Sequence, residues 1–135
     1  MALSCLFCAI AAKEMESHLV YEDEWCVAFL DIRPIRPGHT LVVPKQHAES
    51  IHELDGESYI QLMQAARLMS EWLNRTFQPK KVGMAVVGFD QNHLHIHLIP
   101  LEDYHDLTSK AYIDKVDLTA SKEELKQVAS RLRNG

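Results

Sequence analysis

The sequence lacks an excess of positive charge, long apolar runs and any linker between domains. Its 135 residues carry 14 Lys and Arg against 19 Asp and Glu, a formal charge of -5, so a nucleic-acid or membrane-surface binder, which needs a basic stripe, is not expected. No basic segment opens the chain, and Lys13 and Glu14 interrupt its first apolar stretch, so we expect no signal peptide and no membrane span. Without repeats, low-complexity tracts or Gly/Ser linkers, residues 1–135 are expected to form one domain.

Cysteine is scarce, and its number is odd. Three cysteines, two of them in Cys5-Leu6-Phe7-Cys8, fit a reducing cytoplasm better than a disulfide scaffold. The CxxC spacing suits metal ligands, but it supplies only half of a site. A redox dithiol is the competing interpretation, weakened because no strand precedes the motif to build a thioredoxin-like unit. Cys26 alternates with apolar neighbours and is expected in the core.

The periodicity of apolar residues predicts an α+β domain. Strands are expected at 19–23, 25–31, 40–43, 82–87 and 94–101. Asp55 can cap a helix that runs to about Arg75, and Ser121 with Glu124 forms a capping-box signature before a second amphipathic helix. Few crossover helices separate the strands, so the sheet should be mostly antiparallel, with the helices outside it.

The stretch "HLHIHLIP" places His93, His95 and His97 at alternate positions. Side chains alternate along a strand, so the three imidazoles should project from one face while the apolar residues between them face the core. Three interpretations are open at this point. The row can be the solvent side of a surface strand, a metal site, or a nucleophilic centre, since neutral imidazole attacks phosphorus near pH 7.

Residues 93–99 of this stretch resemble the H-φ-H-φ-H-φ-φ signature of the histidine triad (HIT) nucleotide hydrolases and transferases, in which φ is apolar. "CLFCAI", "YEDEWCVAFLDIRPIRPGHTLVVPKQH" and "HLHIHLIP" occur in family order over about residues 5–101, and the CxxC resembles the bacterial, zinc-containing Hint-like branch. The resemblance implies a HIT-like fold: a mostly antiparallel five-stranded sheet, one long helix, a short N-terminal helix, and a C-terminal helix in an extension over 102–135. It also implies a homodimer built around the long helix and the fourth strand.

The resemblance further implies roles for single residues. In the family the middle histidine, here His95, attacks the α-phosphorus of a nucleotide and forms a covalent intermediate, and the third, here His97, donates to a phosphate oxygen or the leaving group. His39 matches a further histidine of the pocket, and Asp31 matches the carboxylate that accepts from the ribose hydroxyls. The expected substrates are purine nucleotide derivatives, such as phosphoramidates, adenylates or dinucleoside polyphosphates. The apolar walls around the base match Phe7, Ile10, Phe29 and Ile32.

In zinc-bearing members, two cysteines join the first triad histidine and the histidine of a P-x-x-H segment. Here these residues are Cys5, Cys8, His93 and His47. Such a Cys2His2 set is closed and tetrahedral, so the zinc would be structural. His93 would then be a zinc ligand and not a catalyst.

The segment before the triad departs from the family. Many members carry Asn-x-Gly and then a Gly-Gln-Ser/Thr run, whereas residues 84–93 read MAVVGFDQNH, which is shorter and places no hydroxyl directly before the triad. The intact His95 and His97 favour an enzyme, a HIT-type nucleoside phosphoramidase or nucleotide hydrolase. The shortened loop favours the alternative, a zinc-stabilised nucleotide-binding or interaction module with little turnover. A third hypothesis places a catalytic metal on all three histidines.

Overall fold

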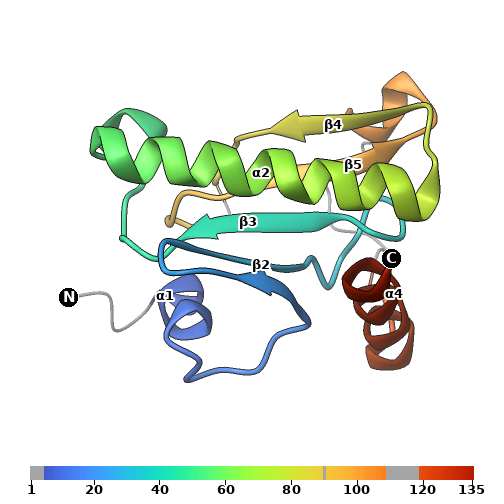
Figure 1. Ribbon diagram of the computed structural model, residues 1–135, viewed down its shortest axis with the longest axis horizontal. Coiled ribbons are helices and arrows are strands. Elements are labelled where there is room, and N and C mark those ends of the chain that lie inside the picture. The colour runs from blue at the N-terminus through green and yellow to red at the C-terminus, as the bar shows by residue number, and fades with distance from the viewer. Residues whose placement is uncertain (1–4, 90, 109–118) are drawn as a thin grey trace.

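A five-stranded antiparallel sheet organises residues 5–89, 91–108 and 119–135, the part of the chain that the computed structural model describes (Figure 1). The strand order is β1-β2-β3-β5-β4, and each of the four neighbouring pairs is antiparallel. The expected α+β class is therefore confirmed. The elements are α1 (Leu6–Ala11), β1 (Leu19–Glu22), β2 (Cys26–Leu30), β3 (Thr40–Pro44), α2 (Gly56–Phe77), β4 (Lys81–Ala85), β5 (Ile96–Leu101) and α4 (Lys122–Asn134), with 3₁₀ turns at Ile51–Glu53 and Tyr104–Asp106.

The two faces of the sheet are covered by different helices. Even-numbered residues of β2, β3 and β5 pack with α2 and α4 in the larger core cluster, which includes Ala28, Val42 and Ile96. Odd-numbered residues of β2 and β3, such as Phe29 and Leu41, pack with α1 in a smaller cluster. Because alternate side chains of a strand point to opposite faces, the side chains of β2 and β3 are buried on both sides of the sheet.

The long helix α2 begins as its sequence predicts and ends two residues later. The Asp55 side chain accepts a hydrogen bond from Ser58 N at 2.8 Å, which satisfies a main-chain donor of the first turn. Gln78 adopts the left-handed conformation, with φ 48°, and Pro79 follows, so the helix stops at Phe77, two residues beyond the predicted end. Figure 1 shows that α2 extends along the length of the sheet.

The two strands on either side of the loop before the histidine row, β4 and β5, are each two residues shorter at that loop than their apolar runs predict. β5 begins at Ile96 and not at residue 94, because its pairing with β3 ends at Val42–Ile96. Leu94 N donates instead to Ala48 O at 2.7 Å. β4 ends at Ala85 and not at residue 87, because its pairing with β5 ends at the pair Ala85–His97. Of the histidine row, only His97 therefore lies within the strand.

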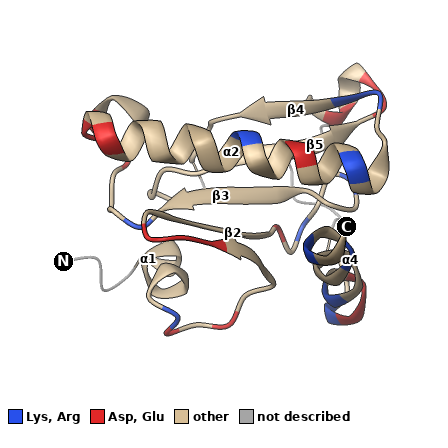
Figure 2. Ribbon diagram, in the orientation of Figure 1, with Lys and Arg blue, Asp and Glu red and all other residues tan. Residues whose placement is uncertain are grey.

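The charged residues form no stripe of one sign in the described part of the chain. Figure 2 shows Lys and Arg distributed over several elements, with Asp and Glu between them on α2 and α4. None of the described helices combines the length and the apolar character that a membrane crossing requires.

Candidate functional site

A pocket of about 550 Å³ lies beside α1 and the end of β2. It brings together most of the residues that the sequence singles out. Asp31, His95 and His97 line it together with the four apolar residues expected around a base, which are Phe7, Ile10, Phe29 and Ile32. Polar neighbours also line it, among them Arg33 of the family segment, Gln91 of the shortened loop, and Ser17, which no motif indicates. Asp90, in the shortened loop, lies outside the described residues.

The apolar part of this pocket is built around Phe7 of α1. The Phe7 ring meets the rings of Phe29 and His95 edge to face, with centroids 5.3 Å and 4.9 Å away. Phe7, Phe29 and Ile10 are buried, whereas Ile32 is 58% exposed. The first three residues therefore form the wall, and Ile32 lies at its rim.

The protonation of His95 follows from its hydrogen bond. His95 Nδ1 lies 2.7 Å from the carbonyl oxygen of His93. A carbonyl can only accept, so Nδ1 carries the proton, and in the neutral ring Nε2 carries the lone pair. His95 is 5% exposed, held between the His97 ring at 4.9 Å and Phe7. This tautomer presents an unprotonated nitrogen, as a nucleophile requires.

His39 and His97 form a hydrogen-bonded pair whose direction can also be inferred. Ile35 N–H donates to His39 Nδ1 at 3.0 Å, so the proton of a neutral His39 lies on Nε2. That nitrogen is 2.9 Å from His97 Nδ1 and 3.6 Å from Asp31 Oδ2. His97 Nδ1 is then the acceptor, and a neutral His97 carries its proton on Nε2. Contrary to the expectation for His39, it does not line the pocket but is fully buried behind His97.

Gly38 allows His39 to reach this position. Its φ is 97°, a conformation that other residues rarely adopt. A Cβ atom here would lie 2.6 Å from the Phe77 ring of α2. Both the backbone conformation and the close approach of Phe77 therefore require glycine at this turn. The next residue, His39, is fully buried.

Asp31 lies at the end of β2, where the chain leaves the sheet. Its Oδ1 accepts from Arg33 N–H at 2.9 Å, and its backbone N–H donates to His39 O at 2.9 Å. Asp31 lines the pocket, and a carboxylate, with two lone pairs on each oxygen, can accept several hydrogen bonds. This capacity suits a pair of neighbouring hydroxyl groups.

A second cluster joins the amino-terminal cysteines to two histidines. One ligand atom each from Cys5, Cys8, His47 and His93 lies within 4.8 Å of the others. Cys5 Sγ to His93 Nδ1 is 3.2 Å, Cys8 Sγ to His47 Nδ1 is 3.1 Å, and the two Nδ1 atoms are 3.1 Å apart. Zinc bonds of about 2.3 Å to sulfur and about 2.0 Å to nitrogen would separate tetrahedral ligands by roughly 3.3–3.6 Å. These three sulfur–nitrogen and nitrogen–nitrogen separations are thus within a few tenths of an ångström of zinc geometry.

The surroundings of this cluster favour a cation. His93 Nε2 lies 2.9 Å from Pro44 O, so it donates there and leaves Nδ1 as the ligand atom. Burial lowers the pKa of His93, which keeps the ring neutral. Burial, followed by the hydrogen bond and charge of Cys5, raises the pKa of the Cys8 thiol to about 11. Without a metal this thiol would stay protonated near pH 7, so a bound cation would be needed to hold it as the thiolate ligand.

The three histidines of the motif do not form one metal set. Among the described residues, His93 groups with His47 and the cysteines, whereas His97 groups with Asp31 and His39. The His39–His97 hydrogen bond accounts for the proximity within the second group. The hypothesis of one catalytic metal on His93, His95 and His97 is therefore wrong for this arrangement.

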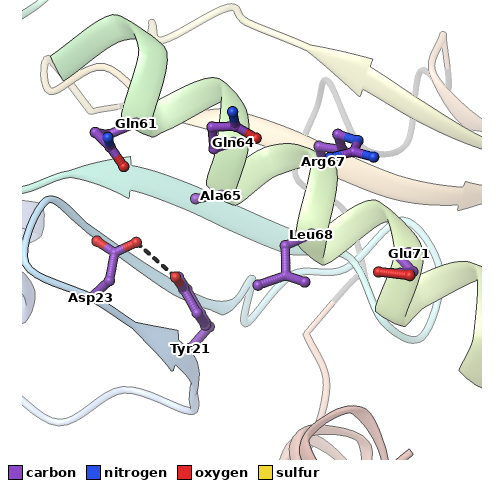
Figure 3. A pocket seen from close by; sticks show the side chains of 8 residues that line it. All are labelled: Tyr21, Asp23, Gln61, Gln64, Ala65, Arg67, Leu68 and Glu71. Carbon is purple, nitrogen blue, oxygen red and sulfur yellow. Dashed lines mark hydrogen bonds between the residues drawn. The ribbon is translucent and has the colours of Figure 1, made fainter. Parts of the chain in front are cut away.

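Another hollow, of about 520 Å³, lies between the β1 end and α2 and contains no histidine or cysteine (Figure 3). Tyr21 O–H donates to Asp23 Oδ2 at 2.7 Å, and the other oxygen of Asp23 accepts from Trp25 N and Cys26 N. The hydrogen bond to Asp23 raises the pKa of Tyr21 to about 12. These groups close the turn between β1 and β2, so the histidine pocket is the candidate active site.

Comparison with known proteins identifies relatives over most of the chain. The sequence model of the HIT domain matches residues 12–104. An adenosine 5′-monophosphoramidase of Saccharomyces cerevisiae is 31% identical over 101 residues, which are 74% of this chain and 64% of that protein.

Solved structures share the fold. A hypothetical histidine triad nucleotide-binding protein from Sulfolobus tokodaii strain 7 superposes with a TM-score of 0.80 at 31% identity, covering 96% of this chain and 90% of that one. A Zn-bound histidine triad family protein from Mycobacterium smegmatis has a TM-score of 0.77, covering 99% and 94% of the two chains, and its 24% identity speaks for the fold alone.

Proposed function

The chain belongs to the HIT domain family, and on this premise we propose that it hydrolyses or transfers purine nucleotide derivatives at the α-phosphate, with His95 as the nucleophile. The observation that carries the proposal is the hydrogen bond from His95 Nδ1 to His93 O at 2.7 Å. It leaves the lone pair on Nε2, in a pocket that also holds a carboxylate and an apolar wall. The phosphoramidase activity named for the yeast relative supports this reaction class.

The pocket suits a nucleoside monophosphate unit. We propose that the base lies against Phe7, Ile10 and Phe29, three buried apolar side chains on one side of the pocket. The ribose hydroxyls would then donate to Asp31. The phosphate would lie at His95 and His97, which line the same pocket.

In the first step, His95 Nε2 attacks the α-phosphorus and a phosphorus–nitrogen bond forms. For a phosphoramidate whose nitrogen has taken a proton from solvent, the bond from phosphorus to that nitrogen breaks, and the bonding electrons leave with the neutral amine. The His95 ring becomes positively charged, and its Nδ1–H continues to donate to the His93 carbonyl, which stabilises that charge. His97 Nε2–H donates to a phosphate oxygen.

In the second step, water attacks the same phosphorus. The bond from phosphorus to Nε2 breaks and its electrons return to His95, which is again neutral. The product is the nucleoside monophosphate, and the proton lost by the water passes to solvent. Another phosphate in place of water would give transfer instead of hydrolysis.

We also propose that Cys5, Cys8, His47 and His93 hold a zinc ion, because their donor set and separations fit a closed tetrahedral site. Bound there, zinc would act as a structural cross-link. Cys8 and Phe7 share the first turn of α1, so fixing Cys8 also fixes the Phe7 ring against His95.

Turnover of an adenosine phosphoramidate by purified variants tests the catalytic proposal. His95→Asn should bind AMP as wild type does and lose turnover by roughly three orders of magnitude or more, because binding cannot replace a covalent nucleophile. His52→Asn, in the exposed turn Ile51–Glu53, is the matched control and should keep full activity. Near-wild-type turnover by His95→Asn would contradict the proposal.

The shortened loop at 88–92 supports a second candidate, a nucleotide-binding module with little turnover. That candidate predicts a wild-type protein that binds AMP but turns over no phosphoramidate. The same assay therefore decides between the two.

A further inference from the structure

We propose that the ion pair between Arg36 and Asp106 is a positioning device that fixes the proton direction of the His39–His97 pair. It rests on the proposed function, in which His97 Nε2 must be a donor toward phosphate. The pair would act by holding the loop 32–38, which joins β2 to β3 and precedes His39.

Backbone groups on both sides of Arg36 contact His39. Ile35 N–H donates to His39 Nδ1 at 3.0 Å, and His39 N–H donates to the Arg36 carbonyl at 3.0 Å. The first of these bonds decides which nitrogen of His39 is protonated. If the loop moved away, His39 could carry its proton on Nδ1, and Nε2 would then accept from His97 Nδ1–H. His97 Nε2 would then be unprotonated, and its lone pair would repel a phosphate oxygen.

The Arg36 side chain is held by the carboxylate of Asp106, in the turn that follows β5. Arg36 Nε lies 2.9 Å from Asp106 Oδ2, and the Asp106 side chain is only 11% exposed. Asp106 Oδ2 also accepts from Glu102 N at 2.8 Å and Asp103 N at 3.0 Å, in the turn directly after β5. Burial alone would raise the pKa of Asp106, but the ion pair with Arg36 and the hydrogen bonds from the two backbone groups hold it below its ordinary value. A charged carboxylate thus joins the loop to the strand that carries His97.

The loop has an independent attachment at its beginning. Ala120 N–H donates to Ile32 O at 3.0 Å. Leu125 and Val128 of α4 line a small cavity together with Pro34 and His39. Because these contacts do not involve Arg36, loss of the ion pair should shift the middle of the loop while the fold is retained.

Nitrogen-15 spectra of the histidine rings test the inference directly. In wild type, His39 Nδ1 and His97 Nδ1 should both be unprotonated acceptors. In Arg36→Gln, which removes the charge and keeps the stem, both rings should show a mixture of tautomers at an unchanged melting temperature. Arg36→Lys, which restores a cation near Asp106, should recover most of the wild-type spectrum.

Turnover should follow the spectra. Removing a preorganised donor to phosphate costs about a hundredfold in rate or more, so partial loss of the tautomer should lower kcat/KM for an adenosine phosphoramidate by about tenfold. Asp106→Asn should give the same loss, and the double variant should lose no more than either single one, because the two residues act as a unit. Lys126→Gln, which removes an exposed cation of α4, should match wild type.

Unchanged ring spectra in both Arg36→Gln and Asp106→Asn would overturn the inference, whatever the rates. Additive losses in the double variant would also overturn it. A wild type with the predicted ring spectra but no turnover would refute the proposed function and leave the positioning of the two rings established.

Discussion

Removal of the proposed zinc should release α1 and leave the rest of the sheet intact. This helix has six residues, and only Phe7 and Ile10 are buried. Burying two such side chains contributes about 3–6 kcal/mol, and each main-chain hydrogen bond adds about 1 kcal/mol. Ordering the backbone costs about 1–2 kcal/mol for each residue. These contributions nearly cancel, so a structural zinc worth on the order of 10 kcal/mol would decide whether α1 stays folded.

Hydrogen exchange followed by mass spectrometry measures this effect. Protein purified without added metal should contain about one zinc per chain, by the one-site logic of a Cys2His2 cluster. After chelation, amides of α1 should exchange rapidly, whereas those of α2 should stay protected, because α2 belongs to the larger core cluster. Cys8→Ser should behave like the chelated protein and melt several degrees lower. Cys26→Ala, which removes a buried thiol outside the cluster, should keep its zinc.

Two results would refute this reasoning. One is a wild type that contains no metal and still shows a protected α1. The other is α1 protection that survives verified removal of the zinc, which would mean that packing of Phe7 and Ile10 suffices.

Three further predictions concern recognition of the ribose, stability at acid pH and the oligomeric state. AMP should bind about tenfold better than 2′-deoxy-AMP, since a hydrogen bond to a charged group contributes roughly 1.5–3 kcal/mol. Calorimetry should show that Asp31→Asn loses this preference. Equal affinities of the two nucleotides for wild type would contradict the prediction. Hydrogen bonds from Lys13 and Lys45 hold the pKa of Glu22 below 4.5, so the melting difference between wild type and Glu22→Gln should be full at pH 7 and shrink as the pH falls below 4.5. A difference that grows in acid would refute this sign. The edge position of β4, with Met84 exposed in it and Val86 and Val87 exposed just beyond its end, favours the expected homodimer, and a monomeric mass in sedimentation would exclude it.

The order of helices and strands could be predicted from periodicity and capping residues, but the strand ends near the site could not. Asp55 and Ser121 cap their helices as expected, because capping depends on residues close in sequence. The beginning of β5 depends on where β3 and β4 end their pairing, and Leu94 bonds to Ala48, which lies far away in sequence. An apolar run alone does not contain that information.

The sequence predicts which residues form the site, but it predicts their arrangement only in part. Alternation along a strand predicts three equivalent imidazoles, yet each of the three rings meets a different partner: His93 the cysteines, His95 the Phe7 ring, and His97 the buried His39. The ion pair between Arg36 and Asp106 joins segments that no motif connects. Their contact is set by tertiary packing, so only the folded structure reveals it.

Rapid quench with an adenosine phosphoramidate labelled at the α-phosphorus tests the central claim most directly. Because His95 Nε2 is the proposed nucleophile, wild type should retain label through a phosphorus–nitrogen bond that survives base and breaks in acid, and His95→Asn should retain none. Peptide mapping should place the label on His95. Rapid turnover by wild type with no protein-bound label at any quench time, or equal labelling of His95→Asn, would contradict the account.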